Sequence, residues 1–275
     1  MDLINSFLNF IFNILFFPFK SIDPVWGMLV FSFLTGIIML FVFKATSDQT
    51  GIKKAKNLVT GHFLAIRLYR DDISLMLDTM KNIFLSILFY MIKSLRPMLF
   101  LIVPVGIVLI QLGIRYEYRP LNVGETTVVS LRLNDHAESV VLNEVELDLP
   151  DGLSMEIPPV RIQQLDEINW RIKAEKPGIY NLVFRYNDKT LNKRLQVVES
   201  LVPISTQIAS DNFITALLNP GESSLPNASA ATSISVMYPK RDFKFLGITL
   251  HWLVAFFVFS LIFGFSLKRF VGVEL

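Results

Sequence analysis

The sequence predicts an α+β membrane protein with three transmembrane helices, a cytoplasmic helical hairpin and an extracytoplasmic immunoglobulin-like antiparallel β-sandwich. Three observations predict this class. Of the 275 residues, 52% are hydrophobic and 18% are charged, which is more apolar than is usual for a soluble protein. Apolar runs of helix length occur in three places. Between the second and third runs, apolar and polar residues alternate with the period of a half-buried strand.

Residues 1–20 read as an interfacial amphipathic helix. Asn5, Asn9 and Asn13 recur at helical spacing, and apolar residues fill the positions around this stripe. Pro18 should end the helix because its nitrogen carries no hydrogen-bond donor. We expect this segment to lie on the membrane as an anchor.

The first predicted span covers residues 25–43. Asp23 followed by Pro24 is a helix-start signal. A run of this length, at about 1.5 Å per residue, just crosses a hydrocarbon core of about 30 Å. Ser32 and Thr35 lie within the span. Small residues there indicate either close helix contact or the wall of a polar groove, and the sequence leaves both interpretations open.

Residues 44–96 form the most basic stretch of the chain, with nine basic and four acidic residues. Short loops rich in Lys and Arg stay in the cytoplasm. The apolar pattern predicts a cytoplasmic helical hairpin that turns at residues 69–72. The candidate residues for a cytoplasmic contact are Lys53, Lys54, Lys56, Arg67 and Arg70.

Two further spans are expected at residues 97–114 and 245–267. Pro97 opens the second span, Pro104 should kink it, and Gln111 is its one strongly polar side chain. The third span ends at Lys268, which begins a predicted cytoplasmic tail over residues 268–275.

Residues 115–243 are predicted to form the extracytoplasmic β-domain. Apolar residues alternate with polar ones along 145–149, 168–174 and 180–186, and turn signals separate these runs. The pattern is typical of a sandwich of roughly seven strands with Trp170 in its core. The domain is acidic, with thirteen basic and seventeen acidic residues between Arg115 and Asp242, so it should lie opposite the basic loop.

These spans predict a multi-pass protein of a cell membrane, of the bacterial inner-membrane type. The N-terminus and the β-domain are expected outside, and the C-terminus in the cytoplasm. The start of the chain lacks the basic segment and cleavage site of a signal peptide, so we expect it to be retained. There is no cysteine, which excludes disulfides and thiol chemistry.

No catalytic, cofactor-binding or metal-binding motif is found in the sequence. A phosphate-binding loop, a dinucleotide fingerprint, an HExxH motif and a nucleophile elbow are all missing, and the three histidines have no ligand partner nearby in sequence. We therefore expect a protein that is not an enzyme, uses no cofactor and does not itself bind nucleic acid. Its expected partners are the lipid bilayer and a membrane or extracytoplasmic protein.

Five segments carry a resemblance to a known family: residues 3–19, 25–43, 49–95, 97–114 and 245–267. Their order resembles that of the YidC/Oxa insertase superfamily. The stretch Lys93-Ser94-Leu95-Arg96-Pro97-Met98-Leu99, followed by Ile102-Val103-Pro104, looks like that family's passage from hairpin into second span. The resemblance implies an insertase or chaperone core whose clients are nascent membrane proteins. It implies a groove lined by Ser32, Thr35 and Gln111, and loop cations that meet a client or ribosome.

Two features depart from that family, and a second function stays open. Bacterial members hold a basic residue in the first span where this chain offers Ser32 and Thr35, and their β-domain precedes the core spans. The alternative is a membrane-anchored scaffold that presents an immunoglobulin-like protein-binding domain outside the cytoplasm. A water-filled groove among the spans favours insertion, whereas a dry and tightly packed interior favours anchoring.

Overall fold

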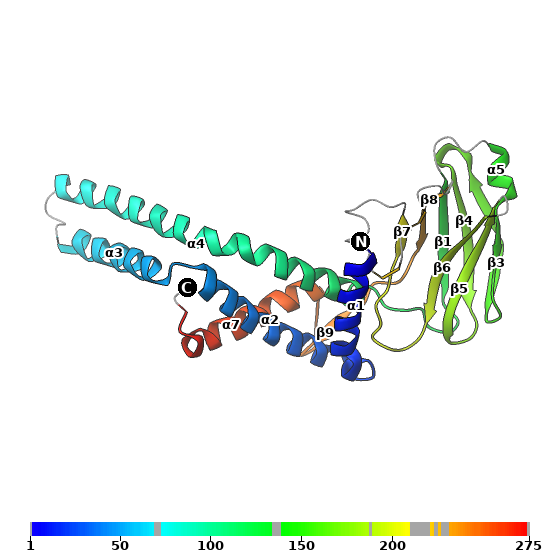
Figure 1. The fold of residues 1–275 in the computed structure, drawn as a ribbon, viewed down its shortest axis with the longest axis horizontal. Helices are drawn as coiled ribbons and strands as arrows, with labels where there is room; N and C mark the ends of the chain where they lie inside the picture. Colours follow the sequence, from blue (N-terminus) through cyan, green and yellow to red (C-terminus); the bar gives the residue numbers. More distant parts are fainter. Residues whose placement is uncertain are drawn as a thin grey trace. The chain divides into compact units, whose positions relative to one another are not determined.

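A computed structural model describes residues 2–68, 73–133, 139–186, 189–209, 221–222, 225–226 and 231–273. The chain divides into two compact units. One unit, called here the β-domain unit, contains Met1–Gly27 and Ile110–Trp252. The other, called the helical unit, contains Met28–Leu109 and Leu253–Leu275. The fold is mixed α+β, with three long apolar helices and antiparallel sheets (Figure 1).

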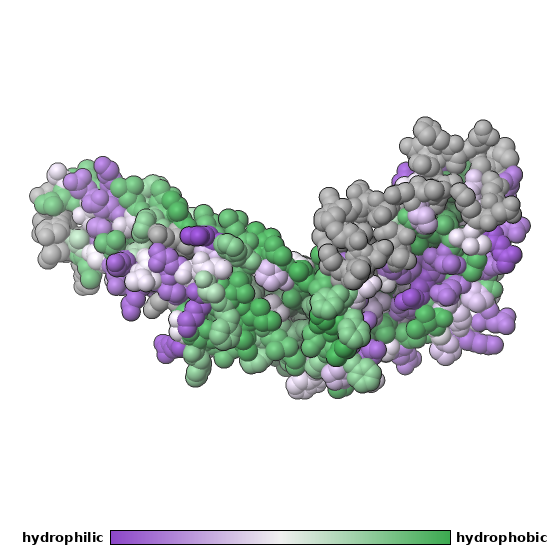
Figure 2. All heavy atoms as spheres, in the orientation of Figure 1, coloured by the Kyte–Doolittle hydropathy of each residue, from purple (hydrophilic) through white to green (hydrophobic). Residues whose placement is uncertain are grey.

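Three helices are long and apolar enough to cross a membrane, as the sequence predicts. They are α2 (Pro24–Thr46), α4 (Ile73–Tyr116) and α7 (Trp252–Val271). Hydrophobic side chains cover these helices on the face shown in Figure 2, and hydrophilic ones gather over the sheets and α3. α3 (Gln49–Leu68) follows α2 and supplies the first arm of the predicted hairpin. Its predicted turn at residues 69–72 lies outside the described residues.

α4 differs from the prediction because it is one helix of 44 residues that contains both Pro97 and Pro104. The expectation that a new helix begins at Pro97 was wrong. A proline inside a helix removes one backbone hydrogen bond. In an apolar environment the other backbone groups have no water to bond to, so they keep their helical hydrogen bonds and the helix continues. The second arm of the hairpin and the second span are therefore a single element.

The third span also begins later than predicted. Phe243–Phe245 and Ile248–Leu250 form the hairpin β9–β10, and helix α7 starts only at Trp252. Gly247 between these strands has φ +81°, a conformation that a right-handed helix cannot contain. The prediction that the third transmembrane helix begins at residue 245 was therefore wrong. The helix α7 that does form still has 20 residues.

Two antiparallel sheets make up most of the β-domain unit. The five-stranded sheet has the order β3-β4-β1-β8-β7 and the three-stranded sheet the order β2-β5-β6. Their strands are β1 (Thr126–Leu133), β2 (Glu146–Asp148), β3 (Leu153–Ile162), β4 (Glu167–Ala174), β5 (Gly178–Tyr186), β6 (Lys189–Val197), β7 (Gln207–Ala209) and β8 (Ala231–Val236). The remaining short elements are α1 (Asp2–Phe16), η1 (Phe17–Phe19), α5 (Ser139–Glu144) and η2 (Gln163–Leu165).

One hydrophobic core contains residues from both sheets. Trp170 of β4 is buried, and its ring meets that of Phe184 of β5 edge to face at 5.4 Å between centroids. Such aromatic pairs add about 0.5–1.5 kcal/mol to the gain from burial. The alternation read in the sequence is the burial pattern of β4, in which every second residue from Ile168 to Ala174 is buried.

Candidate functional site

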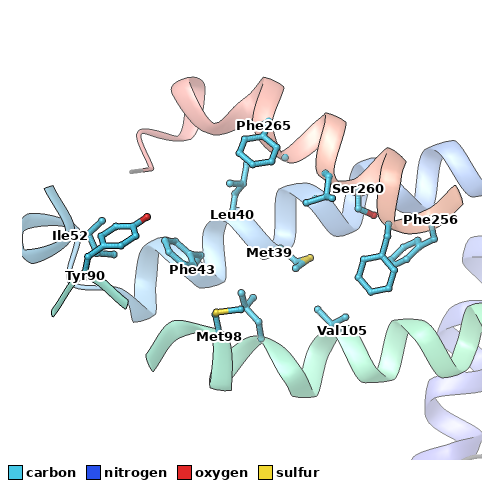
Figure 3. Close-up of a pocket in the computed structure, with 15 residues that line it drawn as sticks. Met39, Leu40, Phe43, Ile52, Tyr90, Met98, Val105, Phe256, Ser260 and Phe265 are labelled. Carbon is cyan, nitrogen blue, oxygen red and sulfur yellow. The ribbon is translucent and has the colours of Figure 1, made fainter. Parts of the chain in front are cut away.

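The helical unit contains an apolar cavity of about 390 Å³ (Figure 3). Helices α2, α4 and α7 supply most of its wall, and Ile52 of α3 closes part of it. The wall is almost entirely hydrocarbon, with Ser260 and Tyr90 as its side chains that carry hydroxyls. Its lining residues are Gly36, Met39, Leu40, Phe43, Ile52, Tyr90, Met98, Leu101, Val105, Phe256, Phe257, Ser260, Leu261, Gly264 and Phe265.

Helical periodicity explains why these side chains converge. On α2 the lining positions are 36, 39, 40 and 43, which recur every three or four residues and so share one helix face. Gly36 lets α2 approach α7 closely, because a Cβ atom built on it would lie 3.3 Å from the Ser260 carbonyl oxygen. Close approach through small residues is the usual way in which membrane helices associate.

Ser260 gives the cavity its polar feature. It is buried, and its Oγ has no hydrogen-bond partner in the part of the chain that the structure describes. A buried hydroxyl without a partner costs about 1–3 kcal/mol. The cavity therefore combines an apolar wall with the Ser260 hydroxyl, which is able to bond to an incoming group.

Ser32 and Thr35, predicted as groove residues, both lie on α2 and are buried, with 0% and 5% of their surface exposed. Neither lines the cavity, although Gly36 next to Thr35 does. Ser32 Oγ, like Ser260 Oγ, has no hydrogen-bond partner within the described residues.

The predicted cytoplasmic contact residues lie on α3. Lys53, Lys54 and Lys56 are exposed, whereas Ile52, which precedes them, and Ala55, which lies between Lys54 and Lys56, are buried. Arg67 falls within α3, but its side chain is outside the description, and Arg70 lies outside the described residues. The three lysines therefore present positive charge on the outer face of a helix whose inner face reaches the cavity through Ile52.

Gln111 belongs to the β-domain unit, where it is buried and joins a polar cluster with α1. Its Nε2 donates to Asn9 Oδ1 at 3.0 Å, and its Oε1 accepts from Arg115 Nη1 at 2.8 Å. Arg115 is fully buried, and its Nη2 donates to Asn13 Oδ1 at 2.7 Å. No carboxylate forms an ion pair with Arg115 among the described residues. Its hydrogen bonds go to the side-chain oxygens of Gln111 and Asn13 and to the Gln111 backbone carbonyl, and its Nε has no partner there.

Asn9 and Asn13 of α1 thus contact Gln111 and Arg115, while Asn13 stays partly exposed. Phe16 of the same helix packs under the guanidinium, with its ring centroid 4.8 Å from Arg115 Cζ. Phe7 and Phe10 on α1 are 61% and 64% exposed. The exposed phenylalanines of α1 suit a contact with lipid.

The sequence did not predict this cluster as a unit, because Asn9 and Asn13 were read as the stripe of an interfacial helix and Gln111 as the lone polar side chain of a span. The available signal was the spacing: Asn9 and Asn13 are four residues apart, as are Gln111 and Arg115, so each pair lies on one helix face. Spacing shows which side chains share a face but not which two helices meet.

No three His, Asp or Glu side chains gather in a way that would hold a metal ion within the described part of the chain. Comparison with known proteins adds no assignment, since no protein-family model and no curated protein matches this sequence.

Proposed function

We propose that the protein is a non-enzymatic integral membrane protein of the YidC/Oxa insertase or chaperone type, with an extracytoplasmic β-domain. In this proposal the helical unit holds an apolar segment of a client membrane protein while that segment enters the bilayer. The observation that carries the proposal is the apolar cavity among helices that are long enough to span a membrane. This cavity is not the water-filled groove that was expected to favour insertion, but its open volume also differs from the tightly packed interior that would favour anchoring.

The size and chemistry of the cavity suit an apolar guest. A dry apolar cavity of roughly 150 Å³ takes up benzene, so about 390 Å³ accommodates several side-chain groups of a client helix. Moving an apolar guest from lipid into the cavity gains no hydrophobic free energy, because lipid is as apolar as the guest. The free energy of binding comes from packing instead, since wall atoms that face a void lack dispersion contacts and a guest restores them. The hydroxyl of Ser260 offers one hydrogen bond to a polar group that the guest carries.

The charge distribution supports a cytoplasmic approach for clients. Lys44 at the end of α2 and Lys268 and Arg269 at the end of α7 are typical of the inner membrane face. With the basic loop inside, the N-terminus and the β-domain lie outside and the C-terminus lies in the cytoplasm. The exposed lysines Lys53, Lys54 and Lys56 are then placed to meet a nascent client or a ribosome.

Site-specific photocrosslinking in cells tests this function. The crosslinker is placed at Met39 and Val105, which line the cavity, and at the matched outward positions Ile38 and Val103, which are 52% and 66% exposed. We expect nascent membrane proteins to be captured from 39 and 105 and lipid from 38 and 103. Capture of lipid alone from all four positions would contradict the proposal.

A membrane-anchored scaffold is the second candidate function. In this alternative the two sheets form an immunoglobulin-like β-sandwich that binds an extracytoplasmic protein. The edge strand β3 favours it, because Met155, Ile157 and Val160 are 40–50% exposed there, and β3 pairs with β4 alone among the described strands. Capture of one defined protein from Val160, with no client at Met39, would select the scaffold.

A further inference from the structure

The two strands of the hairpin β9–β10 are joined by a turn that contains a leucine, which is an unfavourable residue for such a turn in water. The pairing Phe245 with Ile248 leaves Leu246 and Gly247 as a two-residue turn. Their φ angles are +49° and +81°, which is the conformation of a type I′ turn. Asn, Asp and Gly are the residues that favour such positions, and Leu is not among them.

Leu246 is therefore exceptional in conformation and in exposure together. Among the described non-glycine residues, Asp166 and Leu246 have positive φ, and Asp tolerates this conformation because its side chain bonds locally. Leu lacks that compensation. Leu246 is also 86% exposed, so the strained residue is an apolar side chain at the tip of the hairpin.

The two faces of the hairpin differ in chemistry. Residues paired across an antiparallel ladder share a face, and faces alternate along each strand. Phe243, Phe245, Ile248 and Leu250 therefore lie on one face, and Lys244 and Thr249 lie on the other. The apolar face starts in the protein interior, where Phe243 is 2% exposed, and runs outward to Ile248, which is 61% exposed.

The chain also tethers this hairpin to a helix that is able to span a membrane. Trp252, the first residue of α7, follows Leu246 by six positions. At about 3.3 Å per residue, the tip lies within roughly 20 Å of the start of α7, wherever the strands point. A membrane crossed by α7 is therefore within reach of the tip.

We propose that hairpin β9–β10 is a membrane-docking element, with Leu246 and Ile248 inserted at the boundary between headgroups and acyl chains. Its occupant is the lipid leaflet that α7 enters first. Insertion removes Leu246 from water and so offsets the cost of its backbone conformation. Lys244, on the opposite face, is then directed to the headgroup layer, where a cation is favourable.

The absence of cysteine from the sequence allows a direct test. Single-cysteine variants Leu246→Cys, Ile248→Cys, Thr249→Cys and Leu165→Cys of the full chain are labelled with an environment-sensitive fluorophore. They are then reconstituted in vesicles of phosphatidylcholine and phosphatidylglycerol. Ile248 and Thr249 are adjacent residues on opposite faces, which makes them a matched pair. Leu165, 48% exposed in η2, is the water-exposed control.

Quenching by nitroxide-labelled lipid and by aqueous iodide separates the outcomes. At positions 246 and 248 we expect lipid quenching to exceed that at 249 and 165 by at least about threefold, with iodide quenching reduced, as for interfacial side chains. Equal iodide quenching at all four positions would overturn the proposal. Protection from both quenchers at 246 would also overturn it, because the tip would then be covered by protein.

Discussion

Lys193 Nζ donates a hydrogen bond to Glu222 Oε1 over 2.6 Å inside the β-domain unit, and a second one to the Ser205 carbonyl oxygen. The lysine is fully buried, and 12% of the Glu222 side chain is exposed. This contact joins strand β6 to a distant part of the chain through a charge pair that water scarcely screens. Removing one partner of such a pair leaves the other charge buried without compensation.

We therefore expect Lys193→Ala to lower the free energy of unfolding by about 3–5 kcal/mol. The measurement is thermal or denaturant unfolding of the full chain in detergent, followed by circular dichroism. Arg185→Ala is the matched control, because its pair with Asp148 is 64% and 53% exposed and should contribute less than about 1 kcal/mol. Equal losses for the two variants would show that the buried pair is unimportant.

Gly36 should tolerate no large side chain. Its Cβ position lies 3.3 Å from the Ser260 carbonyl oxygen and 3.5 Å from the Gly264 nitrogen, so Gly36→Leu forces α2 and α7 apart. We expect a destabilisation of about 1–3 kcal/mol, the usual cost of overpacking. Gly106→Leu on α4 is the control, because nothing lies within 4 Å of that Cβ position. Thermal stability in detergent compares the two, and a stable Gly36→Leu protein would contradict this helix contact.

The pair Arg119 and Glu125 should contribute an acid-dependent part of stability. Two hydrogen bonds of 2.8 Å from Arg119 lower the pKa of Glu125 from 4.5 to about 2. A depressed folded-state pKa stabilises the protein above the unfolded value and loses this effect as pH falls from 4.5 to 2. Both side chains are 33% exposed, so the effect is small.

Stability measured against pH for Glu125→Gln and for the native chain tests this assignment. The native curve should fall more steeply than the variant curve between pH 4.5 and 2, because glutamine takes up no proton. Parallel curves in that interval would show that another carboxylate controls acid unfolding.

Asn13 and Arg115 should be energetically coupled. Asn13→Leu leaves Arg115 Nη2 buried without its acceptor at 2.7 Å, and an unsatisfied donor of this kind costs about 1–3 kcal/mol. In the double variant Asn13→Leu with Arg115→Leu, that unpaired donor is gone. A double-mutant cycle on thermal stability should therefore give a coupling of at least about 1 kcal/mol. Additive losses would mean that the hydrogen bond seen here carries no energy of its own.

The periodicity of apolar residues in the sequence predicted those helices and strands whose buried and exposed faces follow that periodicity. The apolar runs of α2 and α7 and the alternation of β4 and β5 follow directly from the period of burial. The hairpin β9–β10 was misread because its apolar residues lead into those of α7 with only single polar residues, Thr249 and His251, between them. Gly247, followed by a strand of only three residues, was the local sign of a turn.

The candidate sites could be predicted only in part, since they depend on which faces meet. Ser32 and Thr35 were recognised from their polarity, but cavity walls are built from apolar residues such as Met39, which look like any lipid-facing side chain in the sequence. The link between Asn13 and Arg115 joins positions 102 residues apart, and no periodicity reports a pairing over that separation.

That separation has a consequence for how the protein is made. Asn9 and Asn13 emerge from the ribosome about 100 residues before Gln111 and Arg115, which at 5–20 residues per second is a wait of roughly 5–20 s. Throughout that interval the first helix has a polar stripe with no internal acceptor or donor to meet it. Its docking is therefore a late event of biogenesis, timed by synthesis of the end of α4.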